Sequence, residues 1–252
     1  MSARGFLGAG DLYIARYNSI TGLFEAFKGP YEATKFEIKP NTELKEMTSR
    51  GRSSYGQVIE SVPLPKPVDF TVDLPEVNKE SLAIALMGTT STFTQGSGTI
   101  TDEVITAELD GWVRLSKENL AEAGFVVTNS AGTTTYVNGT DYIFNARLGM
   151  IKALTGGAIT QGQSLKVDCS YAAQSGIQIA GSTQSQVRAK FFFDGINFAD
   201  QLPVHVDVYE AVISAQTAFD FLSDNFASIS LPGRLKTPTG KTEPYKVKLL
   251  NA

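Results

Sequence analysis

The sequence is poor in the residues that most often build catalytic and metal centres. Its 252 residues include one cysteine, Cys169, and one histidine, His205. A single cysteine excludes a disulfide within the chain, which fits assembly in a reducing cytoplasm. One histidine and one cysteine also supply too few ligands for the common zinc sites. We therefore expect no metal site, no cofactor and no enzymatic activity.

Long apolar runs and an excess of basic charge are missing as well. Residues 1–5 lack the apolar core of a signal peptide, and no run approaches the length that spans a bilayer. We therefore expect no membrane binding by this chain. The formal net charge is -4 at pH 7, which argues against a protein that coats DNA. The glycines within residues 5–10 lack the preceding strand and the spacing of a nucleotide-binding loop.

The abundant residues point to β-structure. The chain has 15 Phe, 9 Tyr and 23 Gly, together with many threonines and serines. Aromatic and β-branched residues favour strands, and glycine and serine favour the turns that join them. A chain of this length can bury a sizeable core in one or two domains.

Residues 34–88 contain the clearest pattern. Apolar residues alternate with polar ones over residues 35–39 and again over residues 68–74, which predicts two half-buried strands. The period then changes. Asn78 can cap a helix with one apolar side, and Gly88 stands where a helix usually ends. The pattern predicts a sheet that packs a helix on one face.

Residues 40–61 connect the two strands and look too long and too charged for a plain turn. From residue 32 to residue 60, five acids balance five bases, whereas a nucleic-acid contact would be mainly basic. One interpretation is a solvated flexible loop. The other is a contact surface between subunits, and the residues that would make this contact are Glu43, Lys45, Glu46, Arg50 and Arg52.

Two polar stretches divide the rest of the chain. Residues 89–101 are almost wholly threonine, serine and glycine, and residues 174–186 form a second polar break. Such compositions are typical of linkers. The sequence therefore predicts a core made of residues 1–104 and 175–252, with a small β-module inserted over residues 105–174.

Short alternating segments and turn signals characterise the predicted module. The segments lie at residues 125–128, 134–137, 142–144 and 165–169. Asn138-Gly139 is a strong tight-turn dipeptide, and Cys169 is expected to be a small core residue. The acid-rich run over residues 102–122 lacks the spaced ligands of a calcium loop, so a solvated acidic face is the better interpretation.

The last part of the chain returns to strands. They are expected at residues 187–193, 204–213, 226–231 and 245–250. Asp194-Gly195 is a turn signal, and His205 alternates with valines, which indicates a structural rather than a catalytic role. The tail is basic, and Lys241 and Lys246 could meet the acidic middle of a neighbouring subunit.

This order of elements resembles the major tail tube protein of long-tailed bacteriophages. The matching stretches are the glycine-containing arm with Asp11-Leu12-Tyr13 and residues 34–88, 204–213 and 226–233. The run from Tyr136 to Tyr142, followed by Gly149-Met150-Ile151, is similar to a small Ig-like β-module that recurs in bacteriophage virion proteins. The inserted module departs from the minimal pattern of the tail tube family.

The resemblance implies a mainly β fold, a tail-tube-type sandwich or barrel with one flanking helix. It implies six copies per ring and rings stacked into a hollow tube, with the charged loop and the terminal arms between rings. Implied partners are other copies of the chain, the tape-measure protein, and the tail terminator and distal tail or baseplate proteins. DNA would pass transiently and non-specifically. The location would be the virion tail, assembled in the host cytoplasm, with the module on the tube exterior.

The alternative is a carbohydrate- or receptor-binding β-sandwich on a virion surface. Trp112 and the nine tyrosines could form a platform for a sugar. Against this, aromatic residues more often lie in cores and interfaces than under ligands. The assembly state separates the two hypotheses, because a receptor-binding module should remain a monomer or a small oligomer.

Overall fold

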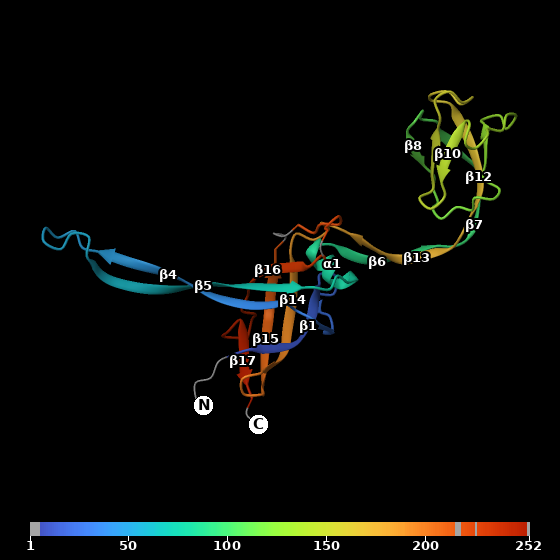
Figure 1. Ribbon diagram of the computed structural model, residues 1–252. Coiled ribbons are helices and arrows are strands. Elements are labelled where there is room, and N and C mark those ends of the chain that lie inside the picture. Colours follow the sequence, from blue (N-terminus) through green and yellow to red (C-terminus); the bar gives the residue numbers. More distant parts are fainter. Residues whose placement is uncertain (1–5, 215–217, 225, 251–252) are drawn as a thin grey trace. The chain divides into compact units, whose positions relative to one another are not determined.

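The computed structural model describes residues 6–214, 218–224 and 226–250. The chain is mainly β, as the resemblance implies: strands account for 55% of it and helix for 3%, and the described residues contain one helix. Its contacts divide it into two compact units (Figure 1). Unit 1 comprises Met1–Ser91 and Ile179–Ala252, and unit 2 comprises Thr92–Gln178.

Unit 1 is built on a nine-stranded sheet. Its strands are β1 (Gly8–Asn18), β2 (Leu23–Phe24), β3 (Lys28–Tyr31), β4 (Lys35–Thr48), β5 (Val58–Leu74), β14 (Val187–Asn197), β15 (Leu202–Ile213), β16 (Ile229–Leu235) and β17 (Tyr245–Leu249). They follow the order β2-β1-β14-β15-β16-β5-β4, with β17 on β15 and β3 on β1. The predicted strands at residues 35–39, 68–74, 187–193, 204–213 and 245–250 are confirmed, and β16 begins three residues later than expected.

The core of unit 1 follows from the alternation of its strands. Phe70, Val72 and Leu74 of β5 point to one side and are almost fully buried, as are Leu12 of β1 and Phe191 of β14. The Phe70 and Phe191 rings lie 4.7 Å apart between centroids. Since β1 and β14 are distant in sequence, this core joins the two ends of the chain.

The predicted helix is confirmed as α1 (Lys79–Ala85). The Asn78 side chain accepts hydrogen bonds from the backbone N–H groups of Glu80 (3.1 Å) and Ser81 (2.9 Å), and the Ser81 hydroxyl accepts from Asn78 N–H (3.0 Å). This reciprocal cap satisfies amide donors that a helix start leaves unpaired. Ala83 and Ile84 are buried, and α1 contacts β16.

A buried carboxylate connects three neighbouring strands. Glu210 of β15 has a side chain only 3% exposed, and it accepts from Arg188 Nε of β14 at 2.7 Å and from Lys236 Nζ, just after β16, at 3.3 Å. Burial alone would raise the pKa of Glu210. The hydrogen bonds and charges of Arg188 and Lys236 outweigh that effect and hold the pKa below its ordinary value.

Replacing Glu210 with Gln should therefore lower the free energy of unfolding at neutral pH by about 1–3 kcal/mol, because two cations lose a buried charged acceptor. A depressed pKa stabilises the fold above the unfolded-state pKa of about 4.3, and this contribution is lost as the pH falls through the lower folded-state value. Urea unfolding of both proteins from pH 7 to pH 3 checks this. A gap that stays constant over that range would contradict the assignment.

The turn predicted at Asp194-Gly195 is wrong. Strand β14 continues through both residues, with Asp194 opposite His205 and Gly195 opposite Val204. Gly195 also faces Gly10 of β1, and a Cβ on Gly195 would lie 2.3 Å from the Phe193 ring. Glycine is needed here because the Phe193 ring packs closely against the backbone of Gly195 within the strand. The dipeptide Asp-Gly alone does not predict this contact.

The loop predicted at residues 40–61 is largely β-structure. Strands β4 and β5 remain paired from Lys35↔Asp73 to Thr48↔Val58, and only residues 49–57 form the tip. The charges of this stretch alternate with apolar residues such as Leu44 and Val62, and that alternation suits a ladder. Charge density alone had suggested a loop.

Unit 2 has its own core between two three-stranded sheets. Its strands are β7 (Gly98–Thr106), β8 (Trp112–Arg114), β9 (Val126–Asn129), β10 (Tyr142–Asn145), β11 (Met150–Ala153) and β12 (Ser164–Tyr171). The sheet orders are β10-β11-β8 and β7-β12-β9. Val127, Tyr142 and Val167 are fully buried, and so is Cys169, as predicted. The strand expected at residues 134–137 is wrong, because only a single bridge, Thr128↔Thr135, forms there.

The two predicted linkers are also strands. Strand β6 (Thr89–Gln95) pairs with β13 (Gln174–Ala180), and β7 covers the end of the first stretch. Threonine is a poor linker residue because its branched side chain favours strands. Unit 2 thus has wider bounds than the predicted module at residues 105–174, because β7 begins at Gly98 and pairs with β12.

Replacing residues 92–178 with a short Gly/Ser linker should leave unit 1 folded. The two units have separate cores, and the paired strands β6 and β13 bring the cut ends together. Circular dichroism and thermal unfolding of the shortened chain check this. Loss of cooperative unfolding would show that the units depend on one core.

Candidate assembly surface

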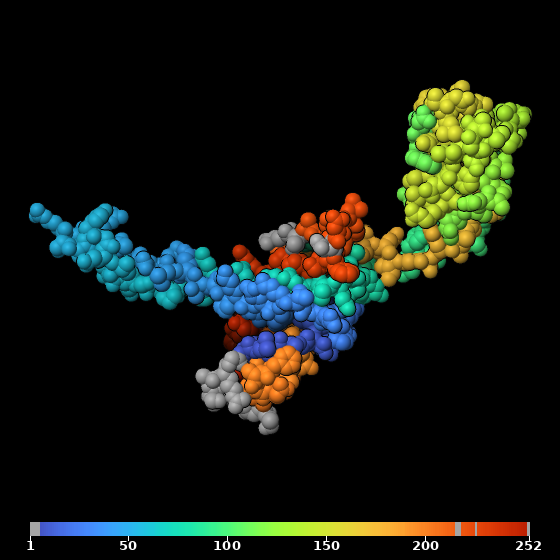
Figure 2. Space-filling model, in the orientation of Figure 1, coloured from blue at the N-terminus to red at the C-terminus, as the bar shows by residue number. Residues whose placement is uncertain are grey.

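The hairpin of β4 and β5 extends beyond the rest of its sheet (Figures 1 and 2). Strand β16 pairs with β5 only from Leu74 to Asp69, so residues 58–67 have β4 as their sole neighbour. At about 3.3 Å per residue, this length reaches roughly 30 Å from the sheet. An isolated two-stranded hairpin is at best marginally stable in water, so a hairpin this long calls for a partner.

Apolar side chains are exposed along the hairpin. Leu44 is 56% exposed, Ile59 59% and Tyr55 79%. Others with large exposed fractions are Met47, Val58, Val62 and Leu64. A run of exposed apolar groups marks an interaction surface. These residues were missed by an interpretation based on charge, although they alternate with the charges in the sequence.

Some of the predicted contact residues of the hairpin form ion pairs within the chain, and others do not. The Glu43 carboxylate pairs with Lys45 and, at 2.9 Å, with Lys66, and the hydrogen bonds from these two lysines lower the pKa of Glu43. Glu46 on β4 and Arg50 and Arg52 at the tip form no ion pair among the described residues. Glu43 and Lys45 are thus already paired within the chain. Glu46, Arg50 and Arg52 are available to a partner.

The predicted basic contact residues lie outside the hairpin, on β17 and in the segment that precedes it. Lys241 Nζ lies 4.5 Å from the centre of the Tyr209 ring. Lys246 of β17 stands opposite Asp207, whose carboxylate pairs instead with Lys248 at 3.3 Å. Among the described residues, no hydrogen bond or ion pair joins these lysines to the hairpin charges. Their contact between subunits stays a prediction.

An apolar groove of about 450 Å³ opens between β4 and β17, which do not pair with each other. Its apolar lining includes Phe36 and Ile38 of β4, Val204 and Val206 of β15, and Tyr245 and Val247 of β17. Side chains of the core are therefore accessible from this side. Strand β17 also keeps one unpaired edge, because β15 is its only neighbour among the described strands.

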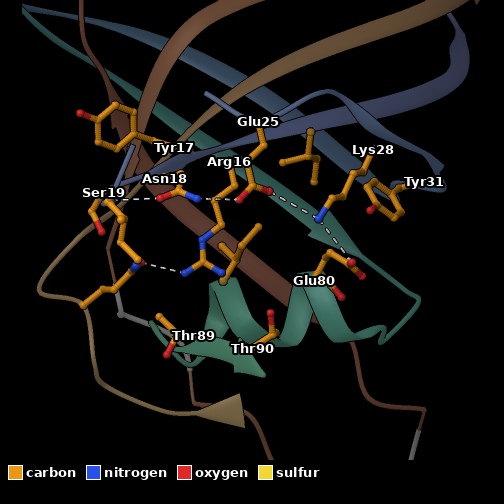
Figure 3. A pocket seen from close by; sticks show the side chains of 15 residues that line it. Arg16, Tyr17, Asn18, Ser19, Glu25, Lys28, Tyr31, Glu80, Thr89 and Thr90 are labelled. Atoms are coloured by element: carbon orange, nitrogen blue, oxygen red, sulfur yellow. Dashed lines mark hydrogen bonds and ion pairs between the residues drawn. The ribbon is translucent and has the colours of Figure 1, made fainter. Parts of the chain in front are cut away.

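A smaller cavity of about 280 Å³ lies between β1, β3 and α1 (Figure 3). Arg16 Nη2 donates to Gly88 O at 2.5 Å and to Gln184 Oε1 at 2.7 Å, and burial lowers the pKa of Arg16. Lys28 stands 3.5 Å from both Glu25 and Glu80. The two basic and two acidic side chains balance in charge and are bonded within the chain. We therefore interpret these polar contacts as structural ones that hold α1 against β1 and β3.

The rare residues of the sequence do not converge on a reactive site. His205 Nε2, on the partly exposed side of the inner strand β15, lies 3.2 Å from an Asp194 carboxylate oxygen of β14. Burial, then Glu103 and Asp168, raise the pKa of Cys169 to about 11, so its thiol is a poor nucleophile. In the described part of the chain, no group of three or more His, Cys, Asp or Glu residues could hold a metal ion. Nor is any described helix long and apolar enough to cross a membrane.

The aromatic residues of unit 2 are divided between core and surface. Tyr136 and Tyr142 are buried. Trp112 is 47% exposed, and Lys152 Nζ lies 5.3 Å from the centre of its ring. The exposed aromatic ring is thus paired with a cation and not with a second aromatic ring.

A family model described as "Protein of unknown function UCP028589" matches residues 5–245. The chain belongs to this family. The matched range spans both units. Among curated proteins, none matches this chain.

Replacing residues 44–63 with Asn-Gly should give a folded subunit that no longer self-associates. The change joins Glu43 to Leu64, which already face each other, and Asn-Gly forms the tight turn that a hairpin requires. Circular dichroism reports the fold, and sedimentation velocity reports the assembly state. Association equal to that of the full-length chain would remove the hairpin from the contact surface.

Proposed function

We propose that this chain is a structural virion protein whose copies form stacked hexameric rings, the tail tube of a long-tailed bacteriophage. The observation that carries the proposal is the β4–β5 hairpin, which is long, uncovered and apolar on its surface. A protein that works alone would leave such an element marginally stable and prone to aggregate. The order of elements resembles that of the tail tube family, and this resemblance is the reason for proposing stacked hexameric rings.

The geometry of unit 1 suits repeated contacts between copies. The free edge of β17 and the β4–β5 hairpin lie on different elements, so a contact between them in two copies would be heterologous. Heterologous contacts close into a ring when the rotation completes a circle, and a second set along the axis stacks the rings. A net charge of -4 is compatible with a conduit that does not hold the phosphates of passing DNA.

The proposal includes the partners that a tube requires. The tape-measure protein would fill the bore, and the terminator and the distal tail or baseplate proteins would cap the ends. DNA would pass later, transiently and without sequence recognition. Unit 2 would lie on the tube exterior, where an independently folded unit does not disturb the contacts between rings.

A second candidate function is binding of a carbohydrate or receptor through unit 2. The exposed Trp112 favours it, because an indole face can stack on a sugar ring. The two functions differ in assembly state. A binding module remains a monomer or small oligomer, whereas a tube subunit polymerises.

Electron microscopy of the purified protein in negative stain, with sedimentation of the same sample, tests the proposed function. Hollow tubes or six-fold rings are the expected result. A monomer at high concentration, with and without an extract that contains tail initiation proteins, would overturn the tube and favour the binding module.

Reversing the charges of Lys241 and Lys246 to Glu should reduce tube formation at low salt, if the basic tail meets acidic groups of a neighbour. The matched control is Lys117→Glu in unit 2, because Lys117 also lies over a tyrosine ring, Tyr171. Pelleting at 50 and 500 mM salt measures the effect, since salt screens exposed charges. Equal pelleting of the double variant and the control would refute this contact.

A further inference from the structure

The two long edges of the β4–β5 hairpin differ in their ability to accept another strand. In an antiparallel pair, alternate residues direct their backbone groups toward the partner and away from it. Ser49 N–H donates to Gln57 O at 2.7 Å across the tip, so the backbone of Ser49 points inward. Counting back along β4, the residues that point outward are Thr42, Leu44, Glu46 and Thr48.

Two prolines occupy outward positions of the opposite strand. Lys45 and Glu43 point inward and face Val62 and Leu64, so Pro63 and Pro65 of β5 point away from β4. Proline has no N–H and cannot donate to an added strand. The outer edge of β5 is thus blocked to strand addition, whereas its hydrogen bonds to β4 are unaffected.

The outer edge of β4 has no such protection beyond the base of the hairpin. Pro40 stands at the base, and from Thr42 to Thr48 every residue retains its N–H. Natural proteins usually protect exposed edges with proline, charge or a covering element. Here the prolines beyond the base are confined to the β5 edge, so the β4 edge is the one that keeps its backbone donors for a partner strand.

Unit 1 itself offers a strand that fits this edge. Strand β17 pairs on one side only, and its Lys246 has no ion pair among the described residues. Glu46, on the open edge of β4, also has none. The free edge of β17 borders the apolar groove, which Leu44 and Pro63, facing each other across the hairpin, could cover.

We propose that the outer edge of β4, from Thr42 to Thr48, adds to the free edge of β17 in a second copy of this chain. The second copy's sheet would then continue from β15 through β17 into the hairpin of the first. This inference rests on the proposed function for its biological role, but its geometry requires only two copies of unit 1.

A pair of proline substitutions at facing positions tests which edge is used. Glu46 and Ser61 face each other, and both point outward from the ladder. Glu46→Pro should abolish association because it removes a donor from the open edge. Ser61→Pro should leave association unchanged because it only extends the existing proline row. Glu46→Ser controls for the lost charge and should still associate.

Circular dichroism and sedimentation velocity of the three variants provide the readout. If Glu46→Pro does not fold, Thr42→Pro replaces it, since Thr42 faces Pro65. Tubes formed by a folded proline variant of β4 would overturn the inference and leave the tube function standing. Small oligomers that the β4 proline abolishes would support the inference without a tube. A parent chain that remains monomeric would overturn both.

Disulfide cross-linking tests the partner strand. Chains carrying Leu44→Cys are mixed with chains carrying Val247→Cys under oxidation, and chains with Ser61→Cys serve as the control. The native Cys169 is buried with a pKa of about 11 and should not react. A mixed dimer with the Leu44 variant and none with the control is expected. The reverse pattern, or no mixed dimer in tubes that form normally, would exclude β17 as the partner.

Discussion

The need to pair backbone hydrogen-bonding groups governs unit 1. A strand presents donors and acceptors along both edges, and each unpaired edge must be solvated, blocked or joined to another strand. Within the body of the sheet, β14 and β15 each have a neighbour on both sides. Among the described residues, the part of the hairpin from residue 41 to residue 66 has no neighbouring strand beyond β4 and β5 themselves, and its two outer edges differ. The prolines of β5 remove donors, while β4 keeps them. The surface that we assign to assembly is thus defined as much by missing hydrogen bonds as by side chains.

The contacts that stabilise the body of unit 1, which is unit 1 without residues 42–66 of the hairpin, do not involve the protruding part of the hairpin. Tightly packed rings such as Phe70 and Phe191, and the buried Glu210 with its two cations, join strands from both ends of the chain. The side chains of residues 42–66, the protruding part of the hairpin, belong neither to this core nor to the Glu210 ion pairs. Substitutions along it can therefore change association without lowering the stability of the body. One chain can therefore combine a well-packed core with a protruding hairpin that needs a partner for its stability.

Local patterns in the sequence predicted what depends on neighbouring residues. The alternation around Phe70 and the cap at Asn78 were sufficient for two strands and the helix. Predictions failed where long-range pairing decided the outcome. Residues 40–61 looked like a loop because their charges were conspicuous, and the threonine-rich stretch looked like a linker because β13 lies far along the chain. Gly195 suggested a turn, although its role depends on Phe193 and on Gly10 of another strand. Of the candidate contact residues, Glu46, Arg50 and Arg52 remain available, while Glu43 is already engaged by two lysines.

The way unit 2 enters the chain has a practical consequence. It begins and ends on adjacent paired strands, β6 and β13, so the body meets it through two neighbouring chain ends. A folded domain with adjacent termini could take its place without altering the register of any strand in unit 1. Insertions and exchanges of this kind preserve the surrounding packing, and they can occur in evolution through a single recombination of contiguous sequence. If copies of the chain polymerise as proposed, the same position would serve to display a foreign domain at regular intervals along the polymer.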